Sequence, residues 1–140
     1  MQFNLNRFLE AQEIDFERAL QEVKNGRKIS HWMWFIFPQY KGLGSSETAN
    51  YYSIQSLDEA NEYLNDSTLG VRLKQITKVL IESNETKIEN IFYFPDNLKL
   101  KSCMTLFAFI EKNEDNLFTL VLDKYFNGEL DSNTLNLIIK

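Results

Sequence analysis

The sequence predicts an all-α, mainly α-helical fold: a single compact orthogonal helical domain over residues 1–140, with room for a short extended segment. Apolar residues recur at helical spacing along most of the chain. Only 5 Gly and 2 Pro interrupt it, and capping residues precede several apolar stripes. A chain of 140 residues has the length of one domain and can bury a core without disulfides.

The first element is predicted as a helix or a bent pair of helices over residues 4–25. Four apolar side chains repeat there at i, i+3, i+4 and i+7: Phe16, Ala19, Leu20 and Val23. Gly26 follows as the stop, because glycine adopts the left-handed conformation that ends many helices.

Residues 32–37, Trp-Met-Trp-Phe-Ile-Phe, are open to two interpretations. Whether extended or helical, this run is apolar on both faces, which indicates burial. If it is helical, Ser30 is its N-cap and Pro38 follows its end. The run is far shorter than the roughly 20 residues of a membrane span. We assign its indoles to the core, with the alternative that one lies at a pocket rim and stacks on a base.

The later elements follow from the same signals. Residues 41–52 contain two glycines and several hydroxyl groups, so an ordered loop is expected. Further helices are predicted from about 57, from 67 to 84, from 98 to 112, from 118 to 125 and from 135 to 139. Their expected caps are Ser56, Ser67, Asp96 or Asn97, and Asp131 or Ser132. Segment 87–94 is ambiguous between a helical turn and a strand, because a short apolar run does not fix its own period.

The net charge of −5 argues against general nucleic-acid binding, which needs a basic surface. The acidic excess lies in residues 45–98, so an anion site is expected nearer the two ends of the chain. One cysteine, Cys103, and the lack of an N-terminal signal pattern predict a cytoplasmic protein. With a single histidine there are too few ligands for structural zinc, and we expect no metal and no cofactor.

The run Gly26-Arg27-Lys28-Ile29-Ser30-His31-Trp32-Met33-Trp34-Phe35-Ile36-Phe37-Pro38-Gln39, followed by Gly42-Leu43-Gly44-Ser45-Ser46, closely resembles the signature of the domain of unknown function 1810 family. The likeness continues along essentially the whole chain, including Ser56-Leu57-x-Glu59-Ala60 and Ser102-x-Met104-Thr105-Leu106-Phe107. The resemblance implies a small, mainly α-helical, single-domain, chiefly bacterial protein with no established activity.

Three positions depart from the pattern of that family. The chain has Asp66-Ser67 where the family usually has His-Pro, Tyr93 where it has Gly, and Cys103 where it has Ser. These departures argue against a functional role at positions 66, 93 and 103. Some members were labelled calpastatin automatically; we reject that label, because calpastatin repeats are disordered and polar and this chain has a full aromatic core.

His31 is the only histidine and the candidate catalytic residue, as a general acid or base. Its neighbours Arg27, Lys28 and Ser30 are candidate ligand-binding residues, because an arginine can hold an oxyanion in two hydrogen bonds and a lysine adds a point charge. The alternative is that His31 forms hydrogen bonds inside a packed junction and that Arg27 and Lys28 are solvated.

The other candidate ligand-binding residues are Trp34, Gln39, Lys99, Ser102 and Thr105. Lys99, Ser102 and Thr105 share one face of a helix, where the two hydroxyls either bond carbonyls of the preceding turn or line a polar pocket. The loop at residues 42–46 resembles a phosphate cradle only weakly, since it lacks the Gly-Lys-Ser/Thr ending, and a plain turn is favoured.

Together these features predict an enzyme or ligand-binding domain for a phosphate-bearing small molecule, either a nucleotide or an ADP-ribose-like compound. The alternative is a protein or peptide interaction module without catalytic activity, in which the aromatic run forms a groove. A third possibility is that the signature serves folding alone. We expect an anionic small molecule as partner and no membrane, and the oligomeric state is left open.

Overall fold

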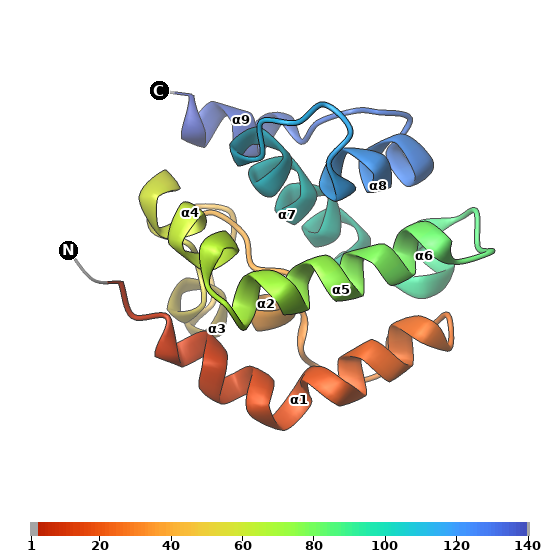
Figure 1. Cartoon of the computed structure of the whole chain (residues 1–140), viewed down its shortest axis with the longest axis horizontal. Coiled ribbons are helices and arrows are strands. Elements are labelled where there is room, and N and C mark those ends of the chain that lie inside the picture. Colours follow the sequence, from red (N-terminus) through yellow and green to blue (C-terminus); the bar gives the residue numbers. More distant parts are fainter. Residues whose placement is uncertain (1–2, 140) are drawn as a thin grey trace.

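The computed structural model describes residues 3–139, and its regular secondary structure is almost entirely helical (Figure 1). Its helices are α1 (Asn6–Lys24), α2 (Met33–Ile36), α3 (Glu47–Tyr51), α4 (Leu57–Asn65), α5 (Leu69–Glu82), α6 (Ile88–Ile91), α7 (Asp96–Ile110), α8 (Leu117–Phe126) and α9 (Ser132–Ile138). Within residues 3–139 the extended pairing is limited to one isolated parallel bridge between Tyr40 and Ile54. The prediction of an all-α fold is confirmed.

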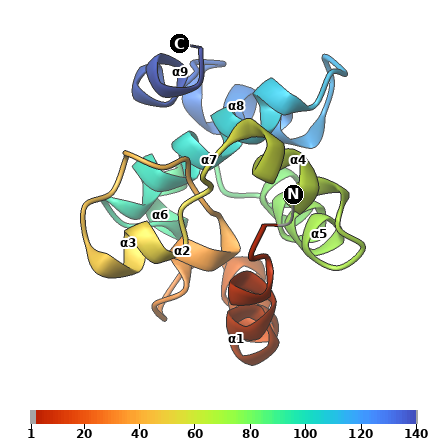
Figure 2. The same cartoon turned by 90° about the vertical axis from the view of Figure 1, so that its left-hand side faces the viewer.

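Two long helices, α5 and α7, organise the packing. Helix α5 packs against α1, α4 and α8, whereas α7 packs against α4, α8 and α9. In Figure 1, α1 and the group α7, α8 and α9 lie on opposite sides of α5. The turned view in Figure 2 shows α3 and α5 on opposite sides of the molecule. The segment that carries α3 therefore lies at an edge of the molecule.

Four aromatic rings contact one another in series through the core. Phe8 of α1 contacts Tyr63 of α4 edge to face, with ring centroids 5.0 Å apart. Tyr63 contacts Phe107 of α7 at 5.6 Å, and Phe107 contacts Phe118 of α8 at 5.7 Å. All four rings are 0% exposed. Since such pairs add to the energy of apolar burial, this series of rings ties together helices that are distant in the sequence.

The caps match the predictions in part. Ser56 Oγ accepts a hydrogen bond from the Glu59 amide and begins α4, and the Asp131 carboxylate begins α9 in the same way. Helix α5 is instead preceded by the Asp66 carboxylate, which accepts from the amides of residues 68 and 69, so Ser67 is not the cap. Asp96 and Asn97 lie within α7, whose N-cap position is Pro95. A carboxylate reaches two amides at once, which favours Asp66 over the neighbouring serine.

In three segments the structure departs from the prediction or decides between the alternatives that the sequence left open. Residues 33–36 form a helical turn and not an extended segment, and Ser30 is not its cap, since the N-cap position is Trp32. Residues 88–91 also form a helical turn, which resolves the ambiguity of segment 87–94. The loop expected over residues 41–52 contains the unpredicted helix α3, which has no buried residue and so leaves no apolar stripe in the sequence.

Candidate functional site

Helix α2 buries most of the tryptophan-rich run and turns one indole outward. Trp32 and Phe37 are 0% exposed, whereas Trp34 is only partly buried. Gln12 of α1 fixes the end of this short helix by donating to the Phe35 carbonyl at 2.7 Å. The two indoles of the run therefore lie in different environments, one in the core and one at the surface.

Trp34 borders a cleft of about 470 Å³, which we call the Lys99 cleft. Its walls come from α2, the segment before α3, α7 and the start of α9. The lining residues are Trp34, Gln39, Leu43, Gly44, Ser45, Ser46, Ala49, Pro95, Leu98, Lys99, Lys101, Ser102, Asp131 and Asn133. Four of the predicted ligand-binding residues thus meet here: Trp34, Gln39, Lys99 and Ser102.

Lys99 contacts the partly buried indole of Trp34. Its Nζ lies 5.1 Å from the centroid of the Trp34 ring, within the range of a cation–π contact. The same ammonium group lies 3.4 Å from the Asp96 carboxylate. Lys28 Nζ contacts the other oxygen of Asp96 at 2.9 Å. One carboxylate therefore faces two ammonium groups, which leaves one positive charge in excess among these three side chains.

The cleft wall formed by α7 contains one hydroxyl group, that of Ser102. Ser102 Oγ lies 3.1 Å from both a carbonyl of the preceding turn and the Asp131 carboxylate. Asp131 also accepts from the amide of Thr134 at 3.0 Å, so donors of the protein engage its negative charge. Thr105 does not line the cleft; its hydroxyl donates to a carbonyl of the preceding turn and accepts from the Asp131 amide. Ser102 thus faces the cleft, while Thr105 holds the start of α9.

The glycine-containing loop forms the opposite wall. Ser46 caps α3 by accepting a hydrogen bond from the Ala49 amide at 3.1 Å. A Cβ built on Gly44 would lie 2.5 Å from the Ala49 Cβ, closer than real Cβ atoms approach. Glycine at position 44 therefore lets the loop pack directly against α3. The sequence favoured a plain turn here, but the loop is part of the cleft.

His31 lies in a different depression, which we call the His31 recess. It has a volume of about 540 Å³ and is lined by His31, Trp34, Phe35, Glu47, Thr48, Tyr51 and Tyr52. His31 itself is exposed. Trp34 is the residue that borders both this recess and the Lys99 cleft.

The cations that precede His31 do not gather around it. The Arg27 guanidinium is stacked over the Tyr93 ring, 4.7 Å from its centroid, and Lys28 pairs with Asp96. Ser30 Oγ donates to the Glu22 carboxylate at 2.6 Å. Arg27, Lys28 and Ser30 therefore line neither the Lys99 cleft nor the His31 recess.

Glu22 determines the path of the chain into α2. Its carboxylate accepts from the amides of Ile29 and Ser30 at 2.8 and 2.9 Å, from the Ser30 hydroxyl, and from Trp32 Nε1 at 2.9 Å. Burial opposes the ionisation of this group, but the hydrogen bonds outweigh burial and lower its pKa from 4.5 to about 2. A buried, ionised carboxylate therefore fixes the turn that separates α1 from α2.

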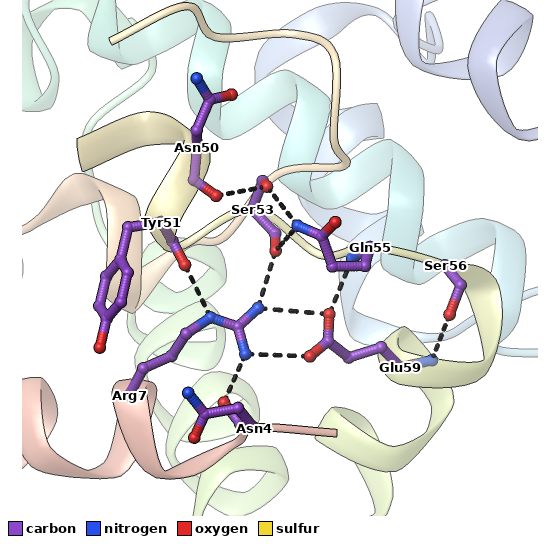
Figure 3. Close-up of polar contacts among 8 residues, drawn as sticks. All are labelled: Asn4, Arg7, Asn50, Tyr51, Ser53, Gln55, Ser56 and Glu59. Carbon is purple, nitrogen blue, oxygen red and sulfur yellow. Dashed lines mark hydrogen bonds and ion pairs between the residues drawn. The ribbon is translucent and has the colours of Figure 1, made fainter. Parts of the chain in front are cut away.

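A second buried carboxylate, Glu59, holds the segment that contains α3 (Figure 3). Arg7 forms a salt bridge with Glu59 at 3.0 Å, and the two side chains are 6% and 2% exposed. The same guanidinium donates to the carbonyls of Tyr51 at 2.7 Å and Ser53 at 2.8 Å. Because Tyr51 is the last residue of α3, Arg7 anchors the helix that lies between the Lys99 cleft and the His31 recess.

The sequence matches the family described as "Protein of unknown function (DUF1810)" over residues 2–138. The chain belongs to this family. The crystal structure of the conserved hypothetical protein Rv1873 from Mycobacterium tuberculosis is similar to this DUF1810 member, with a TM-score of 0.95 and 43% sequence identity. The alignment covers 99% of this chain and 98% of the mycobacterial chain. No curated protein matches the sequence.

Other chemistry in this DUF1810 member is limited. Cys103 is buried, and burial raises the pKa of its thiol well above the usual value, so it is not a reactive nucleophile. Among residues 3–139 no three His, Cys, Asp or Glu side chains gather as metal ligands. In the same described part of the chain, no helix has the length and apolar character needed to cross a membrane.

Several cleft residues of this DUF1810 member were not among the predicted site residues. They are Leu43, Gly44, Ser45, Ser46, Ala49, Pro95, Leu98, Lys101, Asp131 and Asn133. The glycine loop was the available signal for Leu43, Gly44, Ser45 and Ser46. For the others no local sequence signal exists, because they reach the cleft only through the packing of α3, α7 and α9.

Proposed function

We propose that the protein binds a phosphate-bearing small molecule, a nucleotide or an ADP-ribose-like compound, in the Lys99 cleft. The observation that carries this proposal is the position of the Lys99 ammonium, 5.1 Å from the Trp34 ring and beside a glycine–serine loop. A cation attracts phosphate, and an indole offers a face for a ring. The volume of about 470 Å³ lies in the range of small-molecule sites.

Each wall of the cleft supplies a different part of this recognition. Lys99 provides the charge, and Gly44 and Ser45 provide exposed backbone and hydroxyl groups for phosphate oxygens. Ser102 lies on the α7 side, but its single hydroxyl proton is shared between the Leu98 carbonyl and the Asp131 carboxylate and is not offered to phosphate. Lys101 is a second cation of the lining, and its exposed partner Glu129 competes little with an anion, because Glu129 is 71% exposed and such pairs are weak and screened.

The geometry supports binding in the cleft more strongly than catalysis. The predicted catalytic group, His31, lines the neighbouring recess, and Arg27 is stacked on Tyr93. The proposed partner is therefore an anionic small molecule. We also propose that the protein is located in the cytoplasm and is not a general nucleic-acid binder.

The alternative is an interaction module that binds a peptide through an aromatic surface. The predicted groove in residues 32–37 is disfavoured, because Trp32 and Phe37 are 0% exposed. Exposed aromatic side chains exist elsewhere: Phe94 is 75% exposed and Tyr93 52% exposed. Truncation of these two residues, with the Lys99 cleft intact, separates the alternatives: only a peptide-binding surface would lose its partner.

Calorimetric titration with ADP, ADP-ribose and inorganic phosphate tests the proposal. We expect ADP or ADP-ribose to bind, and Lys99→Ala to weaken that affinity at least about tenfold, equivalent to about 1.4 kcal/mol. Lys78→Ala is the matched control, because Lys78 is an exposed lysine outside the cleft. Lack of binding by all three probes, or equal effects of the two substitutions, would overturn the proposal.

A further inference from the structure

The His31 recess differs chemically from the Lys99 cleft. Four aromatic side chains line it, and Glu47 supplies a carboxylate; no lysine or arginine is among its lining residues. Tyr51 is 55% exposed, although its ring meets Tyr52 edge to face with centroids 4.8 Å apart. Such a recess does not favour phosphate. It favours a planar ring that stacks on aromatic surface and donates N–H groups to a carboxylate.

The recess and the cleft are adjacent. Trp34 borders both, and a void of about 10 Å³ between them touches Trp34, Ala49 and Tyr52. That void is too small to hold more than about one water molecule, so Trp34 and α3 are the partition between the two depressions.

Helix α3 displays different residues to the two depressions. Ser46 and Ala49 line the cleft, whereas Glu47, Thr48 and Tyr51 line the recess. Because the two sets of residues alternate along the chain, the cleft and the recess border different faces of α3.

We propose that the His31 recess binds the base of the same ligand whose phosphate lies in the Lys99 cleft, and that this base carries an exocyclic amino group. This inference rests on the proposed function and narrows its ligand class to nucleotides. Tyr51 stacks on the ring, and the Glu47 carboxylate accepts a hydrogen bond from the amino group. His31 and Thr48 provide further polar groups at the rim of the recess.

Calorimetric titration with AMP, UMP and ribose 5-phosphate tests this inference. Stacking of one base on an aromatic side chain corresponds to about a 5- to 150-fold gain in affinity. We therefore expect AMP to bind more tightly than ribose 5-phosphate by a factor in this range. UMP is expected to bind more weakly than AMP, because uracil has no exocyclic amino group.

Substitutions in the recess test which side chains provide the higher affinity for AMP than for ribose 5-phosphate. Tyr51→Ala should lower the affinity for AMP to that for ribose 5-phosphate and leave the latter unchanged, whereas Tyr51→Phe should retain the gain. Glu47→Gln should reduce the preference for AMP over UMP. Tyr93→Ala is the control, because Tyr93 is equally exposed but lies outside the recess.

The outcomes separate this inference from the function on which it rests. If AMP and ribose 5-phosphate bind equally well and both depend on Lys99, the phosphate site stands and the base site is refuted. If Tyr51→Ala weakens both ligands equally, the base site is also refuted. If neither ligand binds the native protein, the proposed function fails and the inference fails with it.

Discussion

Ionisation of Glu22 makes the stability of the fold depend on pH. The pKa of Glu22 is about 2 in the folded protein and 4.5 as an ordinary glutamate, so folding stabilises the ionised form. The contribution is complete above about pH 4.5 and is lost as the pH falls through about 2. At full size it amounts to about 3 kcal/mol. Denaturant unfolding between pH 7 and pH 2 should reveal it as the difference between the native chain and Glu22→Gln.

The test compares the free energy of unfolding of the native chain with that of Glu22→Gln at each pH. The difference between them is needed because other carboxylates also titrate in this range. Glu22→Gln should be less stable than the native chain at pH 7, and the two should converge near pH 2. A constant difference over the whole range would show that the charge of Glu22 does not contribute.

Arg7 should be far more important for stability than an ordinary surface arginine. Removal by Arg7→Ala leaves the buried Glu59 carboxylate unpaired, which typically costs about 3–5 kcal/mol. Arg18→Ala on the same helix is the matched control, since Arg18 is 60% exposed and its pair with Asp15 is worth at most about 1 kcal/mol. Urea unfolding of both variants measures the contrast. Equal losses would contradict a special role for the buried pair.

Neither of these buried groups could be identified from the sequence. Glu22 and Arg7 lie on an amphipathic helix, where a charged residue is assigned to solvent by default. Arg7 meets Glu59 across 52 sequence positions, and no local spacing indicates that contact. Ser102 was easier to assign, because a hydroxyl on a nearly apolar helix must find a partner.

At the scale of elements, Gly70 controls how α5 follows α4. A Cβ at position 70 would lie 1.9 Å from the Leu64 carbonyl oxygen, so the backbone of one helix would have to move. We expect Gly70→Ala to destabilise the protein by about 1–3 kcal/mol, although alanine is the better helix former. Thermal or urea unfolding measures this, with Val71→Ala as the control on an exposed position of the same helix. A more stable Gly70→Ala variant would refute the close contact.

Long elements were predictable, and short ones were not. The stripes in α1, α5 and α8 repeat over two or more turns, so their period is unambiguous, and α7 is long and apolar on nearly all sides. Helices α2 and α6 span a single turn each, which is too short for a period to emerge. Helix α3 buries no residue, and its stability depends on the Ser46 cap and on Arg7, neither of which leaves an apolar pattern.

At the scale of the whole molecule, the sequence predicted the candidate cleft only in part. Trp34, Gln39, Lys99 and Ser102 meet because the fold brings the segments that carry α2 and α7 to one cleft, an arrangement that helical periodicity does not indicate. His31 and Arg27 lie elsewhere, because Glu22 binds the amides of Ile29 and Ser30 and so turns the intervening chain. Closeness in sequence was therefore a poor guide to closeness in space.

The two tryptophans allow folding and ligand binding to be separated. Trp32 is 0% exposed and donates to Glu22, so Trp32→Ala should cost about 3–5 kcal/mol of stability. Trp34 is only partly buried beside Lys99, so Trp34→Ala should cost less stability and abolish most of the affinity for ADP. Urea unfolding and calorimetric titration on both variants measure the two effects. If Trp34→Ala loses as much stability as Trp32→Ala and binds ADP as the native protein does, the signature serves folding alone.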